Sequence, residues 1–207
     1  MTETAVKPGK NTAGPSLPFA IASRTMSRFS FTDTRALSGG ITPVTPIQIP
    51  AVGFLRRLQL KFTVAATAGT AFPGDGPFNL VQSVEFRTAA GNDLIVPVTG
   101  YQLYLINKFG HPTVSSPWSD PKYVSYSTTS GTAATFYLDL CFEIDSETGL
   151  GSIPALASNR SYQLILNYGP YSLITAASAA TITVDGVAHY WSEPPASSAS
   201  GIAQDVQ

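Results

Sequence analysis

The sequence predicts an all-β protein: a jelly-roll β-sandwich of about eight antiparallel strands in two sheets, with one short inserted α-helix. Short segments alternate between apolar and polar residues, as half-covered strands of antiparallel sheets do. Long connections rich in glycine and proline separate these segments, which is typical of Greek-key sandwiches. An immunoglobulin-type sandwich is the rival architecture, but it would be shorter and would not carry the helix.

The expected strands follow one another along most of the chain. Residues 54–64 alternate most clearly, with Phe54 at the start of an apolar face that Arg56 alone interrupts. Residues 41–50 hold three prolines, and because proline cannot donate to a ladder, we expect an edge strand or an extended connection there. The pair Asp185-Gly186 predicts a tight turn or a bulge in the last strand. The complete set of expected strands is 28–32, 41–50, 54–64, 78–87, 94–96, 135–144, 162–168 and 181–191.

One helix is expected over residues 99–109. Thr99 is a good N-cap, and Gln102 three residues later completes a capping box. Gly110 and Pro112 end the helix. Its apolar stripe is the pattern of a helix that packs one face against a core. The stripe consists of Tyr101, Leu105 and Phe109 at i, i+4 and i+8, widened by Leu103 and Ile106.

Residues 76–84 (GPFNLVQSV), a turn and then this helix resemble the first jelly roll of the tectivirus major capsid protein, and the resemblance extends weakly over residues 54–168. Tectiviruses are tailless icosahedral bacteriophages with a membrane inside the shell. The resemblance implies a structural capsid protein of the virion that self-assembles into capsomers. It also implies the partners: other copies of the chain, minor capsid proteins and the internal viral membrane.

The chain departs from the resembled family in length. In that family each polypeptide carries two fused jelly rolls, and three copies make a pseudo-hexagonal capsomer. The 207 residues hold a single sandwich. The chain is therefore a single-jelly-roll subunit that pairs or forms hexamers, or works beside a second, separately encoded jelly-roll capsid protein, or continues beyond a linker.

Composition agrees with an assembled protein. Charged residues make up 12% of the chain, about half of the usual ~25%. Surface rich in serine, threonine and alanine suits burial against neighbours, although a secreted β-domain with a neutral surface would share it. The net charge of −1 predicts no specific nucleic-acid recognition. With one cysteine, Cys141, and no signal peptide or apolar run of ~20 residues, we expect assembly in the host cytoplasm.

Three regions are expected: a flexible N-terminal arm (1–23), a single jelly-roll domain (24–192) and a C-terminal tail or linker (193–207). Basic residues near the N-terminus are candidates to face phosphate groups of the membrane or the genome. A solvated tail is the alternative, because the cations are too widely spaced for a dense patch. The resemblance places this arm on the inner side of the shell. The candidates are Lys7, Lys10, Arg24 and Arg28.

No catalytic constellation, cofactor site or metal site is predicted, so we expect no enzyme. His111 and His189 lie 78 positions apart, which matches no metal-ligand spacing, and the acidic loop around Asp145 lacks the ligands of a calcium loop. Aromatic residues of the long connection are instead candidates for a subunit interface. With Trp191 they would also form the stacking platform of the alternative, a virion spike or carbohydrate-binding β-sandwich module. The interface candidates are Trp118, Tyr123 and Tyr126.

Overall fold

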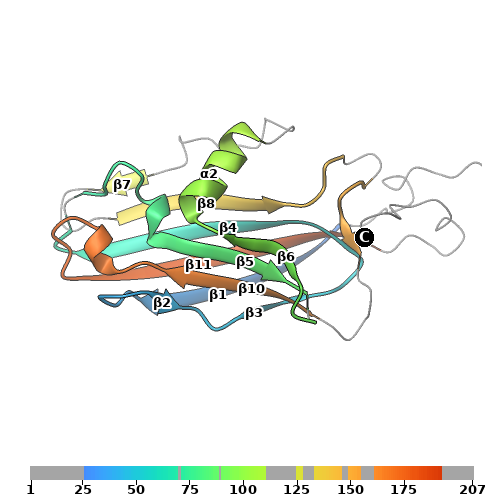
Figure 1. Cartoon of the computed structure of the whole chain (residues 1–207), viewed down its shortest axis with the longest axis horizontal. Helices are drawn as coiled ribbons and strands as arrows, with labels where there is room; N and C mark the ends of the chain where they lie inside the picture. Colours follow the sequence, from blue (N-terminus) through green and yellow to red (C-terminus); the bar gives the residue numbers. More distant parts are fainter. Residues whose placement is uncertain are drawn as a thin grey trace, which may run out of the picture.

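Two antiparallel sheets pack face to face in the computed structural model (Figure 1), which describes residues 26–69, 71–88, 90–110, 125–127, 133–145, 149–154 and 161–192. Sheet A has the order β1 (Met26–Ala36), β11 (Ala179–Trp191), β4 (Phe54–Thr67), β8 (Ala133–Cys141) and β7 (Ser125–Ser127), with β9 (Ile153–Pro154) beside β4. Sheet B has the order β2 (Thr42–Pro43), β10 (Ser161–Tyr168), β5 (Val81–Arg87) and β6 (Asp93–Val98), with β3 (Ile47–Pro50) also beside β10.

The pairing of the strands defines the topology. The short strands β7 and β9 are left aside here. The first strand, β1, pairs with the last strand, β11. The next two strands, β2 and β3, both pair with β10, which is the strand before β11. The next pair is β4 with β8, and the innermost pair is the hairpin of β5 and β6. A long antiparallel hairpin rolled into two sheets in this way is a jelly roll. The predicted fold class is therefore confirmed, and each expected strand has a counterpart.

Aromatic and branched side chains fill the space between the sheets. The ring of Phe62 on β4 stacks on that of Phe136 on β8, with centroids 5.0 Å apart, and meets the edge of Tyr168 from the opposite sheet at 6.3 Å. The Tyr190 hydroxyl of sheet A also crosses to sheet B, donating to the Pro50 carbonyl at 2.8 Å. Each large side chain buried in this way contributes about 1.5–3 kcal/mol to stability.

A bulge at Arg56 changes the expected face of β4. Tyr190 lies opposite Leu55 and His189 lies opposite Arg57, so Arg56 is an extra residue on this strand. Leu55 is consequently fully buried, whereas Phe54 is only half-buried. The prediction that Phe54 begins the inward face was wrong because simple alternation does not continue through a bulge.

Three other expectations are corrected. The last strand, β11, runs uninterrupted through Asp185-Gly186, because Gly186 makes room for the ring of Phe31, which any side chain at position 186 would strike. β8 ends at Cys141, so Ile144 does not continue its buried face and is 62% exposed. Residues 78–80 form a 3₁₀ turn, η1 (Phe78–Leu80), before β5 begins; a second such turn, η4, covers Tyr171–Leu173.

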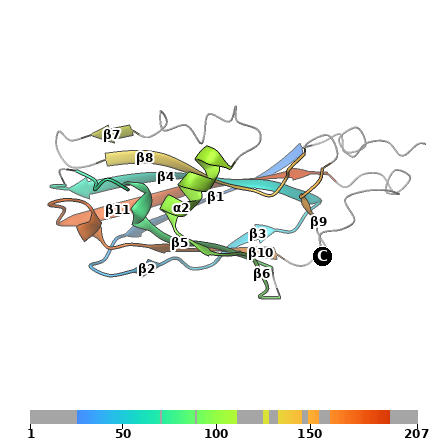
Figure 2. The ribbon, with the colours of Figure 1, turned by 45° about the horizontal axis from the view of Figure 1, so that its top comes forward.

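Both ends of the described chain lie at one end of the sandwich. Met26, the first residue of β1, pairs with Trp191, the last residue of β11 (Figures 1 and 2). The expected arm (1–23) and tail (193–207) lie outside the described residues. None of the helices in the described part of the chain has the length and hydropathy needed to span a membrane.

Candidate functional site

One side edge of the sandwich is covered by the helix α2 (Gly100–Phe109), which lies beside β8 of sheet A and β5 of sheet B (Figures 1 and 2). The predicted capping box is confirmed: the Thr99 hydroxyl accepts from the Gln102 amide at 3.1 Å, and the Gln102 side chain accepts from the Thr99 amide at 3.0 Å. Gly100 allows the helix to approach β5 closely, since a Cβ there would lie 2.7 Å from the Cβ of Val81.

The inner face of α2 completes the core and closes the edge of β8. Leu103 is buried, and the Tyr104 ring stacks on Phe78 with centroids 4.0 Å apart. The buried Asn107 amide donates to the Asp139 carbonyl at 2.7 Å and accepts from the Asp139 N–H at 2.9 Å. Because β7 pairs only with the first residues of β8, Asn107 takes the place of a neighbouring strand at this position.

The outer face of α2 carries three of the five residues of the predicted apolar stripe, and these three face solvent. Tyr101 is 38% exposed, Ile106 54% and Phe109 76%. Leu103 is buried and Leu105 is half-buried, so the prediction that the whole stripe packs on the core was wrong for the other three residues. The helix is apolar around most of its circumference, so the spacing of its apolar residues does not indicate which face packs on the sandwich. The close approach at Gly100 and the buried Asn107 determine which side faces the sandwich.

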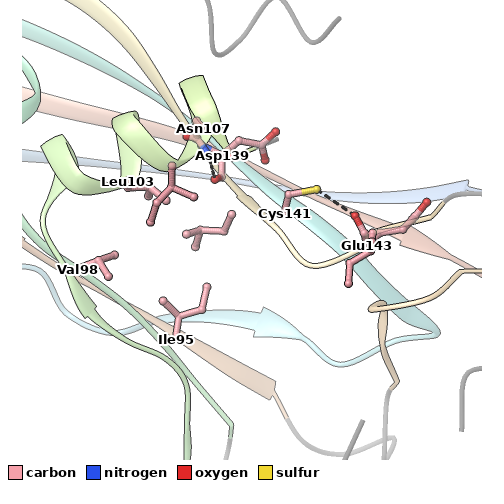
Figure 3. A pocket seen from close by; sticks show the side chains of 11 residues that line it. Ile95, Val98, Leu103, Asn107, Asp139, Cys141 and Glu143 are labelled. Atoms are coloured by element: carbon pink, nitrogen blue, oxygen red, sulfur yellow. Dashed lines mark hydrogen bonds between the residues drawn. The ribbon is translucent and has the colours of Figure 1, made fainter. Parts of the chain in front are cut away.

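A cavity of about 290 Å³ opens at this edge, between β6, α2 and the end of β8. In Figure 3, Ile95 and Val98 from β6 and Leu103 from α2 point toward it. Its β8 side includes Cys141, whose pKa is raised to about 11, first by burial and then by the charge of Asp139. The thiol is therefore protonated at neutral pH and donates to the Glu143 carbonyl at 3.4 Å. The cavity is mostly apolar and holds no activated nucleophile.

Asp139 is the buried carboxylate next to this cavity. Its Oδ2 lies 3.8 Å from Arg57 Nη1, while its Oδ1 is buried without a hydrogen-bond partner. Burial raises the pKa of Asp139 to about 6, and the charge of Arg57 opposes that shift only in part.

His189 lies in a row of polar residues on the outer face of sheet A. Arg28, His189, Arg57 and Cys141 are register neighbours on four adjacent strands. The His189 side chain is buried and shares a 2.7 Å hydrogen bond between its Nε2 and Gln59 Oε1. Burial, followed by the nearby arginines, lowers its pKa to about 4, so the ring is neutral at physiological pH.

Arg56, Glu143 and Trp191 form a closed cluster at the chain-terminus end of sheet A. The Arg56 guanidinium donates to both carboxylate oxygens of Glu143, and Trp191 Nε1 donates to Glu143 Oε2 at 3.0 Å. The guanidinium also lies over the Trp191 ring, 3.9 Å from its centroid. One face of this indole is therefore occupied by the protein's own cation.

Most of the predicted site residues stay predictions. Lys7, Lys10, Arg24, Trp118 and Tyr123 lie outside the described residues, as does His111. Arg28 lies in β1 and is exposed, so it belongs to the sandwich. Tyr126 lies in β7, opposite Ala134 of β8. In the described ranges, no three His, Cys, Asp or Glu side chains gather as a metal site would require.

Solved structures similar to this chain are viral capsid proteins. No protein-family model matches it, and no curated protein matches it. The crystal structure of the major capsid protein of Sulfolobus Turreted Icosahedral Virus matches 81% of this chain and 49% of its own, at 19% identity and a TM-score of 0.54. The two chains share the jelly-roll fold. The atomic structure of that virus matches 84% of this chain and 47% of its own, at 16% identity and a TM-score of 0.53.

VP54 of PBCV-1, fitted into a reconstruction of the virophage Sputnik, matches 81% of this chain and 43% of its own, at 15% identity and a TM-score of 0.49. The chain thus spans about half the length of the capsid proteins that it matches. The resemblance to major capsid proteins of the double jelly-roll lineage, drawn from the sequence, is confirmed at the level of the fold.

Proposed function

We propose that this chain is a structural subunit of a viral shell: a major capsid protein of a tailless, membrane-containing icosahedral virus that acts by self-assembly and catalyses no reaction. The observation that carries the proposal is the match of its jelly roll, over 81% of the chain, to the major capsid protein of Sulfolobus Turreted Icosahedral Virus. The proposal places the chain in the virion, after assembly in the host cytoplasm.

The surface supports an assembled role. Charged residues make up only 12% of the chain, so polar neutral and apolar side chains cover much of the fold. Exposed apolar side chains of α2 lie next to an open cavity at one side edge. Apolar surface of this kind, next to a cavity, is typical of contact sites between proteins.

The placement of the termini supports an orientation in the shell. Arg28, Arg56 and Arg57 lie near Met26 and Trp191, where the described chain begins and ends. The expected arm, with Lys7 and Lys10, precedes this end, and Arg24 follows the arm directly. We place it toward the interior, where its cations would meet lipid headgroups or the packaged genome without reading sequence.

The capsomer is formed by single-jelly-roll subunits that pair or form hexamers, by this chain beside a second jelly-roll protein, or by a chain that continues beyond a linker. Its partners in the proposal are other copies of itself, a second jelly-roll capsid protein, minor capsid proteins and the internal membrane. Trp118, Tyr123 and Tyr126 remain the aromatic residues proposed for contacts between subunits. A carbohydrate-binding platform that includes Trp191 is disfavoured, because Arg56 lies over that ring and Glu143 accepts its N–H.

Electron microscopy of the purified chain tests the proposal. At high protein concentration we expect capsomer-sized particles, hexagonal arrays or closed shells. Sedimentation velocity on the same samples would show species larger than a 21.8 kDa monomer. Single small particles in every image, together with one monomeric boundary at all concentrations, would contradict the shell role.

A further inference from the structure

Exposed apolar side chains are concentrated at one edge of the sandwich. In the described part of the chain, nine large hydrophobic side chains are exposed, and seven of them belong to α2, to β6 or to the segment that follows β8. Ile41 and Val52 are the two others. The seven, called the α2 edge below, are Leu94, Val96, Tyr101, Ile106, Phe109, Ile144 and Leu150.

The α2 edge offers both a projecting side chain and a hole. Phe109, at the last turn of α2, is 76% exposed. The cavity beside it, about 290 Å³, has Ile106, Gly110 and Ile144 among its lining residues. A closed apolar cavity of about 150 Å³ is large enough to hold benzene, so this cavity can receive a phenyl ring. Phe109 is not among the lining residues, so its ring does not fill the hole of its own subunit.

Charge at this edge does not oppose contact between two identical surfaces. Asp93 is paired with Arg87 at 2.7 Å, and Glu143 is held by Arg56. Lys108 lies over two rings of its own helix, 5.6 Å from the Tyr104 centroid and 5.3 Å from that of Phe109. Because these charges are mostly compensated within the subunit, two copies would meet with little repulsion.

The backbone at this edge favours side-chain packing over strand addition. Asn107 already occupies the polar groups of β8 at Asp139, and Pro97 removes a donor from β6. An extended segment of another protein would therefore find an incomplete row of hydrogen-bonding groups. A partner that brings its own apolar side chains and cavity fits this edge better.

We infer that the α2 edge is a two-fold contact with a second copy of this chain, in which Phe109 of each copy enters the cavity beside α2 of the other. In a two-fold contact, the ring of the first copy enters the cavity of the second and the ring of the second enters the cavity of the first. One patch must therefore carry both a projecting ring and a cavity, as the α2 edge does. The inference rests on the proposed shell function, which requires contacts between copies of this chain.

Alkylation of Cys141 by N-ethylmaleimide tests this contact directly. Cys141 is the single cysteine of the chain and lines the cavity, so its reaction reports whether the hole is covered. Measured at pH 8.5 over a range of protein concentrations, the rate should fall at least about tenfold as copies associate. In Phe109→Ser the fall in alkylation rate should require at least about tenfold higher protein concentration, because the contact loses the aromatic ring that it would bury.

Two further variants make the test decisive. Ile144→Ser, on the rim of the cavity, should shift the alkylation curve in the same direction as Phe109→Ser. Ile41→Ser is the matched control, because Ile41 is 65% exposed but lies away from the α2 edge, and it should leave the curve unchanged. All three side chains are largely exposed, so thermal unfolding should show that each variant still folds.

Light scattering on the same samples separates the two ways to fail. If copies associate while the alkylation rate is independent of concentration, the contact lies elsewhere; the inference is then wrong and the shell function stands. If the wild-type chain stays monomeric at every concentration, the shell function and the inference both fail. Cys141 protected equally at all concentrations would mean that the chain covers its own cavity, which also contradicts the inference.

Discussion

The two side edges of the sandwich differ in how they protect themselves. At the β1 edge, polar side chains engage one another: Thr34 Oγ1 lies 2.9 Å from Thr183 Oγ1, and the Thr32 hydroxyl donates to Asp185 at 2.9 Å. At the α2 edge, a helix buries one apolar face and leaves another exposed. Polar groups on a long edge strand discourage further pairing, whereas an exposed apolar helix face promotes it.

This difference indicates that the fold directs association to one side. The two sides differ in their side chains, because β1 carries polar pairs and α2 carries exposed apolar residues. Substitutions on each side can therefore separate the two edges, and Asn107 is the residue on which the α2 side depends most.

Asn107→Leu should destabilise the fold by about 2–4 kcal/mol, because it leaves a buried backbone N–H and C=O of Asp139 without partners. Urea unfolding measures the change. Lys108→Ala, one residue later and exposed, is the control and should change stability by less than about 0.5 kcal/mol. Equal stability of the two variants would show that α2 does not close the edge of β8.

His189, next to the β1 edge, should make the protein less stable in acid. Its folded pKa of about 4 lies below the unfolded value of 6.5, so the unfolded state binds more protons between these values, and stability is lost as pH falls from 6.5 to 4. In His189→Gln this loss should shrink by about 2–3 kcal/mol. Urea unfolding at pH 7 and pH 4 measures the free energy of unfolding at each pH. An equal loss of stability between the two pH values in variant and wild type would contradict the prediction.

Asp139, at the α2 edge, should act in the opposite direction. Its folded pKa of about 6 lies above the unfolded value of 3.8, so the folded state binds more protons and stability falls as pH rises through this window. Asp139→Asn should therefore stabilise the protein by about 1–3 kcal/mol at pH 7.5 and by almost nothing at pH 3.5, since the pKa of about 6 already includes the attraction to Arg57. A variant destabilised equally at both pH values would show that the carboxylate is not desolvated.

The capping box contributes the smallest of these effects. Thr99→Ala should cost about 1 kcal/mol, because the N–H of Gln102 loses its acceptor at the start of α2. Thr99→Ser keeps the hydroxyl and is the matched control. Thermal unfolding of the two variants measures the effect, and a Thr99→Ser variant as unstable as Thr99→Ala would argue against a cap.

The sequence contained enough to predict the sandwich, its strands and both ends of α2. Alternation identifies strands because one face of each sheet is buried, and the capping box is a local hydrogen-bonding pattern. The direction in which α2 faces was not readable, because apolar residues surround most of the helix and a tertiary contact at Gly100 decides it. The bulge at Arg56 likewise depends on pairing with β11.

The candidate site was predicted least well. The cavity forms from β6, α2 and β8, which are separated in sequence, so no local pattern reveals it. One local signal was available: Asn107, four residues after Leu103, places a polar amide on the face that the helix buries. An asparagine in an apolar helix face indicates a buried backbone partner, and here that partner is the edge of β8.

The mass of the purified wild-type chain in solution, measured by light scattering across protein and salt concentration, tests the central claim most directly. The account predicts a mass that rises above the 21.8 kDa of one chain as concentration increases. It also predicts that added salt will not reverse this rise, because apolar contacts are not screened as ion pairs are. A mass of one chain under every condition would contradict it.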